Sequence, residues 1–219
     1  MPQPSCCRVD YDATFDQKDA TDDLASYRHD GPAPSTRRLI DALLREGVEG
    51  ATLLDIGGGV GAMQHELLAA GAASSVDVDL SRAYLEAARD EGVRRGLGER
   101  EAHRYGNFVE VADEIEAADI VTLDRVICCY PHLAELVTAS ASHARHLYGL
   151  VFPVDRWWIR AGARLINVVL RATRQTFRIH VHRTAAVDRL VLGQGFERRS
   201  ASRSLFWQAV VYRRVTGPS

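Results

Sequence analysis

Lysine is almost missing from this chain of 219 residues: Lys18 is the only one, and every other basic side chain is an arginine. A GC-rich genome is the simpler explanation of this bias, and selection for bidentate anion binding is the alternative. An excess of charge is missing too, because 27 basic and 29 acidic residues leave a net charge of −2. This balance argues against a general binder of nucleic-acid phosphates, which usually carries a clear basic excess.

Long apolar runs are also absent. No stretch of the sequence approaches the roughly 18 consecutive apolar residues of a membrane-spanning helix. The first residues, MPQPSCCRVDYDATFDQKD, lack the basic-then-apolar pattern of a secretory signal and soon turn acidic. We therefore expect a cytoplasmic protein with no membrane span. The length and the 46% of hydrophobic residues suit one globular α/β domain with a short extension.

Cysteine is scarce, and its spacing excludes two common uses. The four cysteines form two adjacent pairs, Cys6-Cys7 and Cys128-Cys129. The CxxC spacing of a zinc ribbon is absent, and so is the pattern of a secreted disulfide framework, so we assign no residue as a metal ligand. Three interpretations of the second pair stay open: small apolar packing residues, a reactive thiolate, or a soft-metal or metalloid site shared with the first pair.

The chain divides into an arm and a domain. Residues 1–33 are polar and acidic, and we expect an N-terminal arm or cap with a short helix near 19–28. A helix beginning at Pro34, with Ser35 as its N-cap, opens the domain of residues 34–219 and ends at Gly47. Strands and helices then alternate. Strands are expected at 51–56, 75–78, 103–105, 120–123 and 147–152, with helices at 62–70, around 84–93 and at 133–146.

The alternation of strands and helices stops after Pro153. Residues 155–183 interrupt the repeat and contain a helix at 156–173, which we interpret as an inserted substrate lid. A helix at 185–192 and strands at 196–202 and 205–213 follow. This order predicts a Rossmann-like, doubly wound, mostly parallel sheet of seven strands with a C-terminal antiparallel hairpin and a helical N-terminal arm.

The strongest motif is a glycine-rich turn, LLDIGGGVG at residues 53–61, between a predicted strand and a predicted helix. Glycines let the backbone turn tightly, and the start of the helix offers free N–H groups. Asp79 ends the next strand, where a carboxylate can accept both ribose hydroxyls of an adenosine. The spacing also fits a dinucleotide such as NAD. Against this, Asp55 beside the turn favours a cationic ligand over a pyrophosphate.

Here the sequence resembles the class I S-adenosylmethionine-dependent methyltransferases. The glycine turn is similar to their motif for the methionine part of the cofactor. VDVDLS (76–81) resembles their acidic ribose loop, YGNF (105–108) their adenine segment, and ADIVTLD (118–124) the strand beside the sulfonium. The family usually has Asp where this chain has Asn107. The resemblance implies S-adenosylmethionine as cofactor and these contacts: Asp55, Gly57, Gly58, Gly59, Gly61, Asp79, Leu80, Asn107, Phe108 and Asp124.

Within that superfamily the chain is most similar to the magnesium-protoporphyrin IX O-methyltransferases. The likeness rests on the region from Phe15 to Gly31, on LDRVICCYP (123–131), and on parts of the C-terminal third. One departure is that this family tends to have His where the chain has Cys129, so its proposed base is missing or replaced. Candidate catalytic residues are Tyr27, as a cap over the cofactor, with Cys129, Tyr130 and His182.

The lid segment leaves two interpretations open. Aromatic rings such as Trp157 and Trp158 could stack on a flat substrate while arginines hold its carboxylates. Alternatively, the helix is amphipathic, with Trp158, Leu165 and Val169 toward the core and the arginines in solvent.

The function that these patterns predict is S-adenosylmethionine-dependent methylation of a small molecule, with an oxygen of a flat or carboxylate-bearing acceptor preferred. The alternatives are a cofactor- or metal-binding sensor without turnover, a thiol or metalloid methyltransferase that uses the cysteine pairs, and an NAD-dependent enzyme. We expect a small-molecule partner and no nucleic acid.

Overall fold

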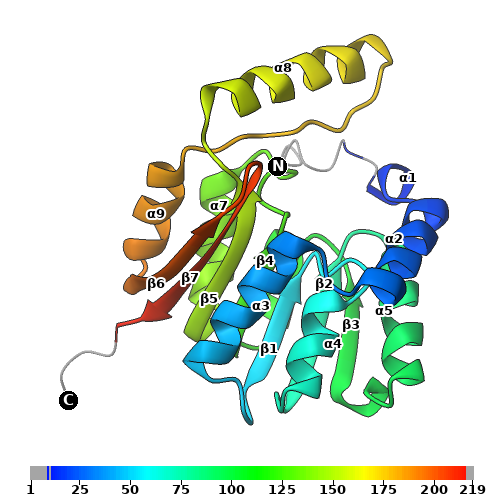
Figure 1. Ribbon diagram of the computed structural model, residues 1–219, viewed down its shortest axis with the longest axis vertical. Helices are drawn as coiled ribbons and strands as arrows, with labels where there is room; N and C mark the ends of the chain where they lie inside the picture. Colours follow the sequence, from blue (N-terminus) through cyan, green and yellow to red (C-terminus); the bar gives the residue numbers. More distant parts are fainter. Residues whose placement is uncertain (1–8, 10, 216–219) are drawn as a thin grey trace.

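The computed structural model describes residue 9 and residues 11–215. Its centre is a seven-stranded sheet in the order β3-β2-β1-β4-β5-β7-β6, in which β7 runs antiparallel to both of its neighbours and the other pairs are parallel. This confirms the predicted fold class (Figure 1). The strands are β1 (Thr52–Ile56), β2 (Ser74–Asp79), β3 (Glu101–Tyr105), β4 (Ala118–Asp124), β5 (Ala144–Pro153), β6 (Phe196–Arg203) and β7 (Trp207–Arg214).

Helices cover both faces of this sheet. Neighbouring residues of β1 serve opposite faces, because side chains alternate along a strand: Leu53 packs in one apolar cluster and Leu54 in the other. Both are buried, as expected for a central parallel strand. The covering helices are α3 (Pro34–Glu46), α4 (Ala62–Ala69), α5 (Arg82–Arg94), α6 (Phe108–Val111), α7 (Leu133–Ser142) and α9 (Thr184–Leu192), and two short 3-10 turns span Gly98–Arg100 and Ala112–Glu114.

The N-terminal segment forms α1 (Tyr11–Thr14) and α2 (Gln17–Asp30), which confirms the short helix expected near 19–28. Asp16 caps α2 by accepting from the backbone N–H groups of Lys18 and Asp19. The helix then packs on α5 through an apolar cluster that includes Tyr27 and Tyr84. Through this packing α2 lies beside the carboxyl ends of the first strands.

Helix α8 (Trp157–Ala172) stands apart from the body, at the top of Figure 1, and residues 173–183 return beneath it to α9. None of its residues is buried. The expectation that Leu165 and Val169 face the core is wrong, since these side chains are 67% and 55% exposed. Trp158 does turn inward and meets the Phe206 ring edge-on at 5.8 Å. None of the helices in the described part of the chain is long and apolar enough to cross a membrane.

One predicted boundary and one predicted cap are wrong for local reasons. The helix expected to reach residue 146 ends at Ser142, because Ala144 already pairs with Ala118 as the first residue of β5. Ser35 is not an N-cap: α3 begins at Pro34, as expected, so the N-cap is Ala33 and Ser35 lies in the first turn. Proline suits the first position of the helix because its missing N–H would have no helical partner there.

Candidate functional site

A cavity of about 1080 Å³ opens at the carboxyl ends of β1, β2 and β4. Ligands bind at this edge in open parallel sheets, because the loops after the strands converge there. One half of the wall comes from α2, the glycine turn and the β2 loop. The other half comes from the β4 loop, α8, the returning segment and the hairpin between β6 and β7.

The glycine turn has a backbone that only glycine adopts easily. Gly57, Gly59 and Gly61 have φ angles of 68°, 58° and 79°. A Cβ atom on Gly58 would lie 2.7 Å from Asp77 Oδ1 and 2.9 Å from Asp55 Oδ2. The turn therefore lies directly on two carboxylates and leaves no room for a side chain.

Asp55 is fully buried at the end of β1 and borders the cavity. Its Oδ1 accepts a hydrogen bond from the Thr122 hydroxyl at 2.7 Å, whereas its Oδ2 has no hydrogen-bond partner in the described part of the chain. Burial, followed by the charge of Asp77, raises the pKa of Asp55 well above its usual value. A cationic ligand would satisfy the unpaired oxygen and stabilise the ionised form.

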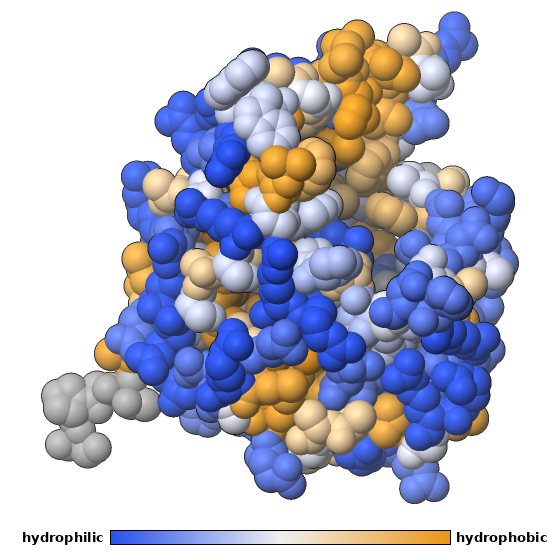
Figure 2. Space-filling view, in the orientation of Figure 1, coloured by the Kyte–Doolittle hydropathy of each residue, from blue (hydrophilic) through white to orange (hydrophobic). Residues whose placement is uncertain are grey.

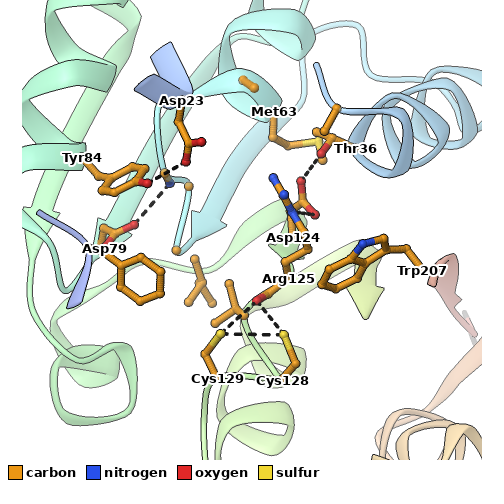
Figure 3. Close-up of a pocket in the computed structure, with 18 of the residues that line it drawn as sticks. Asp23, Thr36, Met63, Asp79, Tyr84, Asp124, Arg125, Cys128, Cys129 and Trp207 are labelled. Atoms are coloured by element: carbon orange, nitrogen blue, oxygen red, sulfur yellow. Dashed lines mark hydrogen bonds and ion pairs between the residues drawn. The ribbon is translucent and has the colours of Figure 1, made fainter. Parts of the chain in front are cut away.

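Asp79 ends β2 and fixes the loops on both sides of it. Its Oδ1 accepts from the Ser81 backbone N–H at 2.8 Å, and its Oδ2 accepts from the Gly59 N–H at 3.2 Å. Burial raises the pKa of Asp79. Figure 3 shows its carboxylate near the glycine turn and Tyr84, and Leu80 also lines the cavity. A ligand hydroxyl would thus meet an acceptor that the backbone already orients.

The segment after β3 contributes Asn107 and Phe108, and both line the cavity. The Asn107 side chain caps α6 by accepting from the Val109 N–H at 3.3 Å, and its amide donates to Glu110 at 3.1 Å. The Asn107 amide also lies 3.5 Å from the hydroxyl of Tyr130, so the structure brings these two predicted residues together.

Tyr27 borders the cavity from α2, and only 5% of it is exposed. Its hydroxyl donates to Glu66 at 3.1 Å, and the Arg95 guanidinium lies 4.5 Å from the centre of its ring. Burial raises the pKa of Tyr27, so the group stays a neutral phenol at neutral pH. The geometry suits a covering ring better than a proton acceptor.

The end of β4 brings Asp124 and Arg125 to the other half of the cavity. The Thr36 hydroxyl donates to Asp124 Oδ2, and Arg125 Nε lies 3.4 Å from Asp124 Oδ1. Burial raises the pKa of Asp124. The Arg125 guanidinium lies 6.0 Å from the centre of the Trp207 ring (Figure 3). Among the described residues that line the cavity, Arg125 is the only basic one.

Sequence reasoning missed Arg125. It adopts a left-handed backbone, with a φ of 62°, which is costly for a residue other than glycine. Strained backbone of this kind is frequent at functional sites, where it determines the direction of a side chain. The available signal was an arginine directly after the strand motif ADIVTLD, at the carboxyl edge of the sheet.

Cys128 and Cys129 follow Arg125 and both line the cavity. Their sulfur atoms are 3.8 Å apart, and both approach the Arg125 carbonyl oxygen, at 3.0 and 3.5 Å. The Cys128 thiol lowers the pKa of Cys129, while its own pKa is raised. Cys6 and Cys7 lie outside the described residues, within which no group of three or more metal-ligating side chains occurs.

His182 does not line the large cavity, although its ring contacts the backbone of the loop that carries Cys129 and Tyr130. It lines a smaller cavity of about 230 Å³ on the polar side of α8, with Arg160, Arg164 and His180. Its Nε2 is 2.8 Å from the Ile127 carbonyl oxygen, and burial lowers its pKa. No histidine of the described chain lines the larger cavity. The large cavity thus brings together Tyr130, Cys129 and the residues of the glycine turn, whereas His182 lines the smaller cavity behind the same loop.

Residues 54–147 match the model of a protein family described as a methyltransferase domain. No curated protein matches the chain. Among solved structures, the chain is similar to magnesium protoporphyrin IX methyltransferase from Synechocystis PCC 6803 with bound SAH, with 17% identity, a TM-score of 0.67 and 82% of each chain covered.

Two O-methyltransferase family proteins have the same fold. For the one from Burkholderia thailandensis, the identity is 17% and the TM-score 0.71, with 94% of this chain and 62% of that chain covered. For the family 2 protein from Planctomyces limnophilus in complex with apigenin, the values are 16%, 0.67, 91% and 62%. At these identities the structural likeness concerns the fold.

Proposed function

We propose that the chain is a class I S-adenosylmethionine-dependent methyltransferase and that it methylates an oxygen of a flat, carboxylate-bearing small molecule. The observation that carries this proposal is the composition of the cavity beyond the glycine turn. There a single basic side chain, Arg125, stands among aromatic and aliphatic residues, and no histidine of the described chain is present.

The cofactor fits the half of the cavity that contains the glycine turn. We infer that the unpaired Oδ2 of Asp55 receives the ammonium group of its methionine part, while Gly57, Gly58, Gly59 and Gly61 let this part approach the backbone. Asp79 would accept the ribose hydroxyls beside Leu80, and Asn107 and Phe108 would hold the adenine. Asp124 would border the methyl group. Tyr27 would cover the bound cofactor from α2.

The acceptor would occupy the other half. Trp207, Trp158 and Phe206 offer aromatic surfaces on which a flat molecule can stack. Arg125 offers donors that match a carboxylate. Asp124 acts as a positioning residue for Arg125, because the two groups form an ion pair at 3.4 Å and Thr36 fixes the carboxylate from the other side.

A carboxylate acceptor also fits the lack of a base. When bound, S-adenosylmethionine supplies a methyl group on a positively charged sulfur, which a carboxylate oxygen can accept without first losing a proton. The chain then has to orient the two reactants and exclude water, and the apolar wall near Arg125 serves both needs. Cys129 and Tyr130 border this region. His182, outside the cavity, would have no proton to move.

A specific observation favours a second candidate, a thiol or metalloid acceptor. The sulfur atoms of Cys128 and Cys129 lie 3.8 Å apart within the cavity, and the pKa of Cys129 is lowered. Two thiols at this spacing suit a soft ion.

The test is a panel of planar carboxylic acids paired with their carboxamides, phenols and arenethiols, with formation of S-adenosylhomocysteine as the readout. We expect turnover with acids and none with the carboxamides. Arg125→Met should lower kcat/KM for acids by roughly 10- to 100-fold, the effect of one charged hydrogen-bonding pair, without changing cofactor affinity. Arg104→Met is the matched control, because both arginines are 47% exposed and each is paired with one carboxylate. Turnover confined to phenols or thiols would contradict the proposal.

A further inference from the structure

Charge is distributed unevenly along this nearly neutral chain. Residues 156–183 contain no acidic residue and seven arginines, which leaves 20 basic and 29 acidic residues in the rest of the chain. The basic segment consists of α8 and the returning segment, so it forms one projecting layer above the cavity (Figure 1). Its arginines are Arg156, Arg160, Arg164, Arg171, Arg174, Arg178 and Arg183.

Helix α8 also exposes apolar side chains on the side away from the cavity. Trp157 is 74% exposed and Val168 is 64% exposed. At about 100° per residue, they lie roughly 180° and 160° around the helix from Ile166, which lines the cavity. Closing α8 over a bound ligand would therefore leave these two side chains in solvent. Figure 2 shows an apolar area over α8, at the top of the view.

Arginines flank this apolar surface along one side. Arg164 precedes Val168 by four residues and Arg171 follows it by three, so both lie next to it on the helix. Both are exposed, and within residues 9 and 11–215 neither forms an ion pair with an acidic side chain. Arg160 and Arg164 also converge on the smaller cavity with His180 and His182.

We propose that α8 docks on an anionic lipid surface, with Trp157, Leu165 and Val168 inserted among the acyl chains and Arg164 and Arg171 at the level of the phosphates. A helix with exposed apolar residues beside arginines has the composition that lies in a membrane interface rather than across it. Each arginine near an anionic surface adds electrostatic attraction to it. The excess of acidic residues in the body is repelled by the same surface, so the chain would dock with this layer first.

A second copy of the chain is the competing occupant, and charge argues against it. A twofold contact through α8 would place the same arginine-rich segment on both sides of the interface. No acidic residue of the segment is present to compensate for that repulsion. An anionic surface is complementary in charge to the arginines of residues 156–183, whereas a second copy of α8 carries the same positive charge.

The test is co-sedimentation of the full chain with vesicles of phosphatidylglycerol and phosphatidylcholine, compared with vesicles of phosphatidylcholine alone. We expect binding to the anionic vesicles only, and binding should weaken as salt is added. Val168→Glu should reduce the partition coefficient at least tenfold. Val93→Glu on α5 is the matched control, since Val93 is 65% exposed and lies on another helix. Arg164→Glu should also reduce binding, with Arg145→Glu, at the start of β5, as its control.

Three results would overturn the proposal. The first is that the wild-type chain stays in the supernatant with anionic vesicles at low salt. The second is that Val93→Glu and Arg145→Glu lose as much binding as the α8 variants, which would make the effect one of net charge. The third is that sedimentation velocity shows a dimer that Val168→Glu dissociates. Far-UV circular dichroism and the Tm establish that each variant is folded, and cofactor affinity gives an independent check of the body.

Discussion

The two halves of the large cavity are built in different ways. Around the cofactor half, the backbone determines the shape: three glycines have left-handed angles, and Gly58 rests on the carboxylates of Asp55 and Asp77. Around the other half, side chains determine the shape, and α8 has no buried residue. A special backbone conformation requires glycine at fixed positions, which can be recognised as a motif. A cavity wall made of side chains can be built by many different sequences. The comparison teaches why the cofactor is easier to predict than the acceptor.

The halves also differ in charge. Asp55 and Asp79 bring carboxylates to the cofactor half, whereas the other half contains Arg125, paired with Asp124, as the only basic residue among the described residues that line the cavity. A cationic cofactor and an anionic acceptor would thus each meet the opposite charge, which also discourages either from binding in the wrong half. The predictions below test this division, from the largest expected effect to the smallest.

Asp55→Asn should lower the affinity for S-adenosylmethionine by roughly 10- to 100-fold, because it removes a charged partner of the ammonium group. Calorimetric titration measures the change. Asp41→Asn is the control, since Asp41 is exposed on α3 and does not line the cavity. Equal affinity of wild type and Asp55→Asn would contradict the charge assignment of the cofactor half.

Alanine in place of glycine should have opposite effects in the two halves. Gly58→Ala places a methyl group against two carboxylates and should destabilise the chain by about 1–3 kcal/mol. Gly162→Ala on α8 meets nothing within 4 Å and should stabilise that helix by up to about 1 kcal/mol. Urea unfolding measures the free energy of unfolding of both variants, and cofactor affinity is the second readout. If Gly58→Ala were as stable as wild type and bound the cofactor normally, the backbone would not determine the shape of the cofactor half.

Asp77→Asn should change how stability depends on pH. Burial raises the pKa of Asp77 in the folded chain, so its contribution is fully present below the unfolded pKa and is lost as the pH rises through the folded value. The free energy of unfolding of the variant should therefore exceed that of wild type at neutral pH and fall less as the pH rises.

Asp119→Asn is a control with the opposite sign. A backbone hydrogen bond from Thr52 lowers the pKa of Asp119, so its contribution is present at neutral pH and is lost as the pH falls through the folded value. This variant should be less stable than wild type at neutral pH. Unfolding curves between about pH 2 and 8 measure both, because the contribution of Asp119 is lost only below its unfolded pKa. Parallel curves for wild type and Asp77→Asn would refute the burial argument.

His182→Ala should have the smallest effect. Because His182 faces the smaller cavity and contacts the Ile127 carbonyl, we expect kcat to change by less than about threefold and its pH profile to stay the same. A loss of a hundredfold or more with a shifted pH profile would return His182 to the role of base.

Much of the fold follows from the sequence alone. The apolar run that ends at the glycine turn predicts β1, and the antiparallel hairpin at the C-terminus follows from the two final strands after Gly195. The boundary between α7 and β5 was not predictable, because residues 143–146 contain no glycine or proline to mark it. There, pairing of Ala144 with Ala118 decides the structure, and that contact is not local.

The site divides in the same way. Asp55, Asp79 and the glycines were predicted as neighbours, and the structure brings them to one cavity. The position of Arg125 after β4 was available in the sequence, but the direction of its side chain could not be predicted, because it depends on a left-handed backbone at the end of β4. The orientation of α8 could not be predicted either. Apolar and small residues cover most of the circumference of the helix, so periodicity does not show which of them face the cavity.

The most direct test of the account is calorimetric titration of the wild-type chain and Asp79→Ala with S-adenosylmethionine, and with NAD for comparison. We expect micromolar binding of S-adenosylmethionine, a loss of roughly 100-fold in the variant, and no binding of NAD. Folded wild-type chain that binds NAD, or that binds S-adenosylmethionine equally well with and without the Asp79 carboxylate, would contradict it.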